Sequence, residues 1–156
     1  MRIAELLEPK RVIADLAGTT KSEVLRELAE CLARDFPGVA ADALHRALEL
    51  RETLGPSTGL EHGVAIPHAK LLGLPRIVGC FARSREGVAF GAPSGERSHL
   101  FFVLAAPDSP AALPLHLKAL ARVARVLRNA DVRAALLAAT SGDELWNVLC
   151  HADDVS

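Results

Sequence analysis

Apolar and polar positions in the first third of the chain predict a short strand followed by two helices. Lys10–Ala14 is the candidate strand, because two branched apolar residues lie at its centre. Thr20-Lys21-Ser22-Glu23 has the Thr-x-x-Glu form of a capping box and therefore marks a helix start. Pro37-Gly38 is expected to end that helix, and a second helix is expected over Ala40–Thr53. Helical spacing of apolar residues predicts the buried faces: Val24, Leu25, Leu28, Leu32 and Ala33 in the first helix, Leu44 and Leu48 in the second.

The middle of the chain combines turn formers with short apolar runs, which predicts strands. Gly63–Ile66 is a brief apolar stretch that follows a segment rich in glycine, serine and threonine. Arg76–Ser84 and His99–Ala106 are expected to be buried strands, since an unbroken apolar run suits a strand covered on both faces. Gly87–Phe90 is expected as a shorter strand and Ala92–Gly95 as a turn. The short connection between the two long strands implies that they pair antiparallel.

From Leu113 onward the pattern becomes helical again. The apolar residues at helical spacing are Leu117, Leu120, Ala121, Val123, Ala124 and Leu127. Shorter helices are expected near Asp131–Ala139 and Gly142–Leu149. Helices on both sides of a run of strands predict an α/β fold, with a mixed β-sheet covered by helices on both faces. No repeat or linker divides the sequence, so we expect a single domain over residues 1–156.

Composition adds limits to this picture. Half of the 156 residues are hydrophobic, 24% are charged and the net charge is −1, which is ordinary for a soluble globular protein. The mixed charges favour neither a nucleic acid nor membrane insertion, and Met1–Lys10 lacks the pattern of a secretory signal. The three cysteines, Cys31, Cys80 and Cys150, fit neither a disulfide framework nor a zinc cluster. We expect them to be small buried residues of a cytoplasmic protein.

His68 is the first candidate for chemistry. It follows a short apolar stretch and Pro67, which restricts Ile66 to extended geometry. Gly63 and the small residues around the histidine leave room for a ligand, and open α/β sheets bind ligands where strands end. The alternative is a structural histidine that is hydrogen-bonded at a strand end.

Four further residues suit a bound anion. Arg51 continues the apolar stripe of the second helix, so its guanidinium is expected to point inward at a carboxylate or phosphate; the alternative is an interaction with the helix C-terminus. Ser57 and Thr58 add two hydroxyls nearby. Pro114 suits the first turn of a helix, which places His116 near a helix N-terminus, where anions bind.

The remaining histidines offer weaker candidates. His45, His99 and His151 are expected to have no direct role. His62 could join His68 at a metal, but no acidic or cysteine ligand has suitable spacing, so we expect no metal. The nucleotide phosphate loop, the dinucleotide fingerprint and the Gly-x-Ser-x-Gly elbow are all absent, which predicts no bound cofactor.

Leu50–Lys70 as a whole resembles the signature of one class of enzyme IIA domains. It combines Arg51-Glu52, Ser57-Thr58-Gly59 and Gly63-Val64-Ala65-Ile66-Pro67-His68. These elements are similar to those of the fructose/mannitol/nitrogen-regulatory IIA class of the bacterial phosphoenolpyruvate:sugar phosphotransferase system. The likeness extends over nearly the whole chain, with counterparts for Lys21, Gly87–Phe90 and His116–Leu120.

The resemblance implies a fold and an activity. The fold is the mixed sheet with helices on both faces that the pattern also predicts. The activity is protein-to-protein phosphoryl transfer, in which His68 accepts the phosphoryl group, His116 is the second active-site histidine and Arg51 stabilises the phosphate, with Ser57 and Thr58 nearby. No metal is needed, because a phosphohistidine donor is already reactive.

The same resemblance implies partners and leaves the role open. The donor would be an HPr-like carrier, and the recipient either a regulated target protein or a IIB domain that passes phosphate to a sugar. We favour the nitrogen-regulatory role over the sugar-specific one; a non-catalytic binding module is the alternative of another class. The oligomeric state is expected to be a monomer or a weak dimer.

Three positions depart from the pattern of that class. Glu61 stands where a glycine is usual, which is expected to bring a carboxylate near the phosphate. Pro56 is unusual in its turn, and Ser94-Gly95 replaces a frequent Asp-Gly. None of these changes removes a proposed catalytic group.

Overall fold

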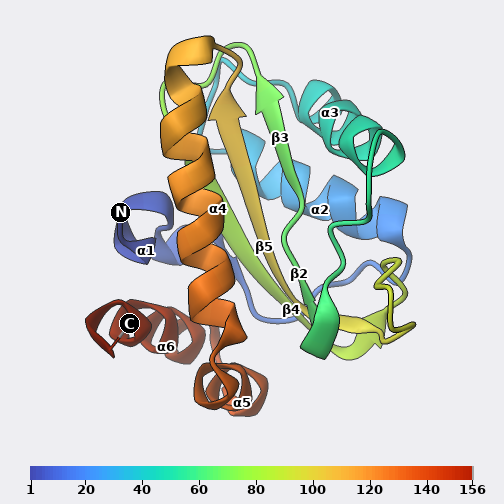
Figure 1. The fold of residues 1–156 in the computed structure, drawn as a ribbon, viewed down its shortest axis with the longest axis vertical. Helices are drawn as coiled ribbons and strands as arrows, with labels where there is room; N and C mark the ends of the chain where they lie inside the picture. Colours follow the sequence, from blue (N-terminus) through green and yellow to red (C-terminus); the bar gives the residue numbers. More distant parts are fainter. Residues whose placement is uncertain (156) are drawn as a thin grey trace.

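A five-stranded mixed β-sheet forms the centre of the computed structural model, which describes residues 1–155 (Figure 1). Its strands are β1 (Val12–Ile13), β2 (Val64–Ala65), β3 (His68–Leu71), β4 (Val78–Val88) and β5 (Ser98–Pro107). β4 and β5 pair antiparallel, as predicted, whereas β1 runs parallel to β4. β2 and β3 both run parallel to β5 and pair with successive parts of it. The predicted mixed sheet is confirmed.

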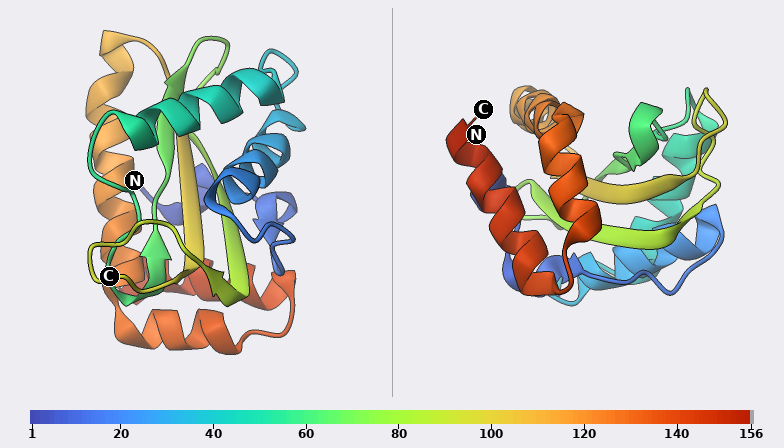
Figure 2. Two further views of the ribbon diagram at one scale, coloured as in Figure 1. Left: turned by 90° about the vertical axis from the view of Figure 1, so that its right-hand side faces the viewer. Right: turned by 90° about the horizontal axis from the view of Figure 1, so that it is seen from below.

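Helices cover both faces of this sheet (Figure 2). On one face lie α2 (Lys21–Ala33) and α3 (Ala41–Thr53). On the other lie α1 (Ile3–Leu6), α4 (Leu113–Arg128), α5 (Ala130–Ala138) and α6 (Gly142–Val155). Short 3-10 turns are η1 (Pro9–Arg11), η2 (Glu61–Gly63) and η3 (Pro110–Ala112). Alternate residues of β5 enter the two cores, because successive strand side chains point to opposite faces.

The first helical pair agrees closely with the sequence pattern. Thr20 Oγ1 accepts a hydrogen bond from the Glu23 amide at 3.2 Å, and the Glu23 carboxylate accepts one from the Thr20 amide at 3.1 Å. The predicted capping box is therefore confirmed. α2 ends at Ala33, before Pro37-Gly38, and Ala33 is only half-buried while Ala29 takes its place in the core.

Some predicted boundaries are wrong, for local reasons. Lys10–Ala14 reduces to β1, because its first residues belong to η1. Gly87–Phe90 is not a separate strand, since β4 continues through an irregularity after Arg83 as far as Val88. α6 extends beyond Leu149, and α1 was not expected at all. The turn at Ala92–Gly95 is confirmed by a 2.9 Å hydrogen bond from the Gly95 amide to the Ala92 carbonyl.

Only some of the residues at helical spacing form the buried face of α4. Leu117 and Ala121 are exposed, and the face that packs on the sheet consists of His116, Ala119, Val123, Val126 and Leu127. The histidine therefore points toward the sheet, and apolar side chains of the first turns lie at the surface.

Two further expectations concern the burial of the cysteines and the presence of a membrane-spanning helix. Cys31 and Cys80 are buried, as predicted, but Cys150 is only half-buried. Within residues 1–155, no helix combines the length and the apolar character needed to cross a membrane.

Candidate active site: two histidines between β3 and α4

His68 is the first residue of β3, at a break in the strand pairing beside β5. Val64 pairs with Leu100 and His68 with Leu104, so β2 and β3 keep one register along β5. Pro67 separates them because it has no amide proton, while its carbonyl accepts from the Leu104 amide at 2.9 Å. The pattern predicts His68 at the end of a strand. Instead the residue begins β3, and it lies at the break between β2 and β3.

One hydrogen bond sets the tautomer of His68. Its Nδ1 lies 2.9 Å from the carbonyl oxygen of Ile66. A carbonyl only accepts, so Nδ1 carries the proton and Nε2 keeps its lone pair. Burial and the positive charge of Arg51 lower the pKa of His68, although the bond to Ile66 and the charge of Glu52 oppose them. The ring is therefore neutral near pH 7, with Nε2 as its nucleophilic nitrogen.

His116 faces the same place from the first turn of α4. Its ring centroid lies 5.7 Å from that of His68, and the ring planes are 78° apart. The residue is 4% exposed, and its Nε2 is buried without a hydrogen-bond partner among the described residues. Burial, followed by the charges of His68 and Lys70, lowers the pKa of His116 to about 4. An orphaned buried nitrogen costs about 1–3 kcal/mol, which a ligand could recover.

Arg51 lies at the rim of the site, in the last turn of α3. The guanidinium of Arg51 is predicted to point inward, and the structure agrees only in part. The residue is half-buried, and its Nη1 donates to the Pro56 carbonyl at 3.1 Å. The guanidinium still borders the cavity that contains His68 and His116. Its five N–H donors leave several available beyond the bond to Pro56.

The cavity shared by these residues has a volume of about 440 Å³. Lys70 also borders it, a residue that the sequence analysis missed although it lies two positions after His68 and so on the same side of β3. The remaining lining is mainly apolar and includes exposed side chains at the end of α3, just after it and at the start of α4: Leu50, Leu54, Leu113 and Leu117. Cations and a helix N-terminus at one end of an apolar cavity favour a bound anion.

Ser57 and Thr58 do not border this cavity. The Ser57 hydroxyl donates to the Phe90 carbonyl at 2.7 Å. The Thr58 hydroxyl donates to Glu52 Oε2 at 2.6 Å, and Lys21 Nζ lies 2.7 Å from Glu52 Oε1. Both hydroxyls therefore fix the loop after α3 instead of facing His68. Glu52, which follows Arg51 in the sequence, is the centre of this network.

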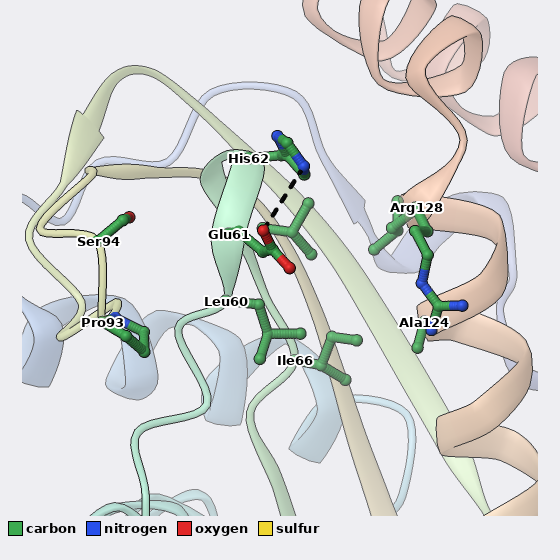
Figure 3. Close-up of a pocket in the computed structure, with 10 residues that line it drawn as sticks. Leu60, Glu61, His62, Ile66, Pro93, Ser94, Ala124 and Arg128 are labelled. Atoms are coloured by element: carbon green, nitrogen blue, oxygen red, sulfur yellow. Dashed lines mark ion pairs between the residues drawn. The ribbon is translucent and has the colours of Figure 1, made fainter.

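Glu61 and His62 border a second cavity, on the same side of the sheet but farther along α4 (Figure 3). Glu61, which is expected near a phosphate on His68, lines this second cavity and not the one that contains His68. His62 and His68 likewise line different cavities. Among residues 1–155, no group of three or more histidine, cysteine, aspartate or glutamate side chains is placed to hold a metal.

Comparison with known proteins decides the family. The family model described as "Phosphoenolpyruvate-dependent sugar phosphotransferase system, EIIA 2" matches residues 5–152. The chain belongs to this EIIA 2 family. The resemblance seen in Leu50–Lys70 is thereby confirmed.

Relatives of this EIIA 2 domain are named either as nitrogen regulatory proteins or as fructose-specific components of the phosphotransferase system. The chain is 38% identical over 149 residues to a nitrogen regulatory protein of Bradyrhizobium diazoefficiens, covering 96% of this chain and 95% of that protein. It is 33% identical over 155 residues to a fructose-specific EIIABC component of Bacillus subtilis, covering 98% of this chain and 24% of that protein.

Solved structures support the fold of the EIIA 2 domain. The crystal structure of the nitrogen regulatory protein IIA-Ntr from Neisseria meningitidis aligns with a TM-score of 0.85 and 32% identity, covering 94% of this chain and 98% of that one. The predicted α/β class is confirmed by this alignment and by the observed sheet.

Proposed function

We propose that this chain is a phosphocarrier that accepts a phosphoryl group on Nε2 of His68 from an HPr-like phosphohistidine protein. The observation that carries this proposal is the hydrogen bond from His68 Nδ1 to the Ile66 carbonyl, which leaves Nε2 as the reactive nitrogen. Membership of the EIIA 2 family supports phosphoryl transfer as the reaction.

The transfer needs no general base. The lone pair of His68 Nε2 attacks the phosphorus in line, and the P–N bond to the donor histidine breaks as the new one forms. The proton on Nδ1 stays in its bond to Ile66, so the ring becomes a phosphohistidine without losing a proton to solvent. Positioning and electrostatic stabilisation supply the catalysis of such a loose transition state.

Three groups around the cavity balance the charge of the transferring oxygens. Arg51 offers the N–H donors that Pro56 does not use. His116 is neutral, so its buried Nε2 can carry a proton and donate it in a hydrogen bond to a phosphoryl oxygen. Lys70 adds a positive charge at the rim. Ser57 and Thr58 act indirectly by fixing the loop that follows Arg51.

Exposed leucines around the cavity supply a docking surface for protein partners. Leu54 is 75% exposed and Leu117 is 57% exposed, although both border the cavity of His68. Contiguous exposed apolar side chains beside a reactive group mark a protein-protein contact. The same surface would meet the donor first and the recipient later.

We place the chain in the nitrogen-regulatory branch, whose phosphorylation state would control other proteins. The higher identity to the nitrogen regulatory protein, 38% against 33% for the fructose-specific component, favours this role. The sugar-specific alternative, transfer to a IIB domain, is supported by the same fructose-specific relative. Incubation of the phosphorylated chain with IIB domains separates them, since only a sugar-specific component would lose its phosphate rapidly.

The test of the phosphocarrier role is labelling with phosphoenolpyruvate, enzyme I and an HPr-like carrier. We expect an acid-labile phosphate that is lost in His68→Ala and kept in His45→Ala, a control histidine of α3 that does not border the cavity. An acid-stable phosphate on a hydroxyl would contradict the proposal. Absence of label with a competent donor would favour the non-catalytic binding module.

A further inference from the structure

A small hairpin holds Thr58 opposite Ile66. The segment after α3 pairs antiparallel with β2 through a bridge between Gly59 and Ala65. Next to that bridge, the Ile66 amide donates to the Thr58 carbonyl at 3.0 Å. Thr58 therefore contacts the backbone just before Pro67, at the break between β2 and β3.

A buried carboxylate fixes Thr58 from the other side. The Thr58 amide donates to Glu52 Oε1 at 3.2 Å, and its hydroxyl donates to Glu52 Oε2 at 2.6 Å. Lys21 Nζ lies 2.7 Å from Glu52 Oε1 and so ties the carboxylate to α2. The Glu52 side chain is 6% exposed and Thr58 is 4% exposed, and hydrogen bonds to a buried charge are strong. The amide, the hydroxyl and the carbonyl of Thr58 are thus all held by hydrogen bonds.

The peptide group between Ile66 and Pro67 sets the tautomer of His68. Its carbonyl oxygen accepts a hydrogen bond from His68 Nδ1 at 2.9 Å. A proline nitrogen carries no proton, so the orientation of this group depends on the hydrogen bonds that flank it. On one side, the Ile66 amide donates to Thr58. On the other, the Leu104 amide donates to the Pro67 carbonyl at 2.9 Å. The contact with Thr58 is therefore one of the supports of the carbonyl that holds the His68 proton.

We propose that Glu52 is a positioning residue that keeps His68 in its Nδ1–H tautomer by fixing Thr58. Three consecutive hydrogen bonds connect the two residues: Thr58 donates to Glu52, Ile66 donates to Thr58, and His68 donates to Ile66. Glu52 does not border the cavity that contains His68, so it acts through the backbone and not on the phosphoryl group.

The tautomer matters because only one of the two neutral forms is a phosphoryl acceptor at Nε2. The hydrogen bond made at one ring nitrogen decides which nitrogen carries the proton. When the Ile66 carbonyl turns away from the ring, part of the protein carries the proton on Nε2 of His68. That nitrogen then has no lone pair with which to attack phosphorus. The effect on transfer rests on the proposed function, whereas the tautomer itself does not.

Ring-nitrogen NMR of the unphosphorylated protein, at a pH above the pKa of His68, measures the tautomer. We expect a single Nδ1–H form in the wild-type protein. In Thr58→Val, about half of the rings should carry the proton on Nε2, because without a fixed acceptor neither form is strongly favoured. Glu52→Gln leaves one acceptor oxygen, so its shift should be smaller and in the same direction. Thr58→Ser keeps the hydroxyl and should restore the wild-type tautomer.

Transfer kinetics with a phosphorylated HPr-like carrier separate positioning from docking. At a saturating concentration of the carrier, the transfer rate of Thr58→Val should fall at least about twofold, since the Nε2–H form does not react. The carrier concentration that gives half of the maximal rate should not change, because the docking surface is intact. Thr58→Ser should transfer at the wild-type rate.

Thr140→Val and Glu144→Gln are the matched controls. Thr140 and Glu144 form the same kind of pair at the start of α6, where the Thr140 amide and hydroxyl donate to the carboxylate at 2.9 and 2.8 Å. Neither residue borders the cavity of His68. Both variants should keep the wild-type tautomer of His68 and the wild-type transfer rate.

A single Nδ1–H form in Thr58→Val would overturn the proposal, even if the variant is less stable. An equal change of tautomer in Thr140→Val, or a slower transfer in Thr58→Val without a change of tautomer, would overturn it as well. If Thr58→Val does not fold, the tautomer of Glu52→Gln decides by the same criterion. Absence of label on the wild-type protein would contradict the phosphocarrier role and leave the tautomer result unaffected, so the two failures are distinct.

Discussion

His116 combines burial with an unmet hydrogen-bonding need. Its ring is 4% exposed, yet Nε2 has no partner among the described residues, and its pKa is lowered to about 4. A buried nitrogen without a partner is costly, and a hydrogen bond to an acceptor removes that cost. A phosphoryl oxygen on His68, whose ring centroid is 5.7 Å away, would be that acceptor.

Phosphorylation should therefore raise the pKa of His116. A dianion beside the ring stabilises the imidazolium, opposing the burial that lowers the pKa in the free protein. NMR titration of the His116 ring in the free and phosphorylated protein measures this shift. An unchanged pKa would mean that His116 does not contact the phosphoryl group.

Acid should destabilise the unphosphorylated protein through the same residue. The folded-state pKa of about 4 lies below the ordinary value of 6.5, so the unfolded chain takes up the proton more readily. The free energy of unfolding should fall as pH decreases from about 6.5 to about 4, by up to about 3 kcal/mol. Urea unfolding of wild type and His116→Gln across that interval checks this. The variant should lose much of the pH dependence, and an equal dependence in both would contradict the assignment.

The sequence indicates some residues of the candidate site and conceals others. His68 and His116 are predicted because a proline near each restricts the local backbone to a strand end or a helix start. Lys70 was missed because a lone lysine in a short strand gives no signal without knowledge of which face carries His68. Ser57 and Thr58 are predicted beside the phosphate, but their hydroxyls bond to the Phe90 carbonyl and the Glu52 carboxylate, which residue type alone does not reveal.

At the scale of elements, the site depends on how α3, β3 and α4 meet. β3 begins at the break after Pro67, α4 begins just before His116, and α3 ends just after Arg51. The predicted helix boundaries lie close enough to the observed ones to indicate the start of α4 and the end of α3. Leu117 has the spacing of the buried residues of α4 and yet is exposed, because the apolar pattern alone does not show which apolar side chains the fold buries.

Replacing exposed leucines should weaken docking without unfolding the protein. Leu54→Ser and Leu117→Ser remove apolar surface beside His68, so the KM for the phosphorylated carrier should rise about tenfold while stability changes little. Leu137→Ser, at a position 46% exposed on α5, is the control and should leave the KM unchanged. Steady-state transfer kinetics give the result. Equal effects at all three positions would argue against a docking surface.

The loop after α3 should depend on one buried carboxylate. Glu52 is 6% exposed at its side chain and pairs with Lys21 and Thr58. Glu52→Gln should lower the free energy of unfolding by about 1–3 kcal/mol, because Lys21 loses its charged partner. Urea unfolding measures the change. Glu30→Gln removes a pair that is exposed on both sides and should cost less than about 1 kcal/mol.

At the scale of the whole molecule, the α/β class and the mixed sheet followed from the sequence pattern. Two long apolar runs joined by a short connection were sufficient to predict the β4–β5 pair. The order of the sheet was not predictable, because the pairing of β1, β2 and β3 depends on contacts between residues far apart in the chain. That order places the strand break and the start of α4 side by side and so assembles the two histidines.

The position of the phosphate on the imidazole ring tests the central claim most directly. Phosphorus-proton correlation NMR of the phosphorylated protein distinguishes a phosphate on Nε2 from one on Nδ1. The account predicts a single phosphohistidine at His68, attached through Nε2, because Nδ1 is held by the Ile66 carbonyl. A phosphate on Nδ1 of His68, or on any other residue, would contradict it.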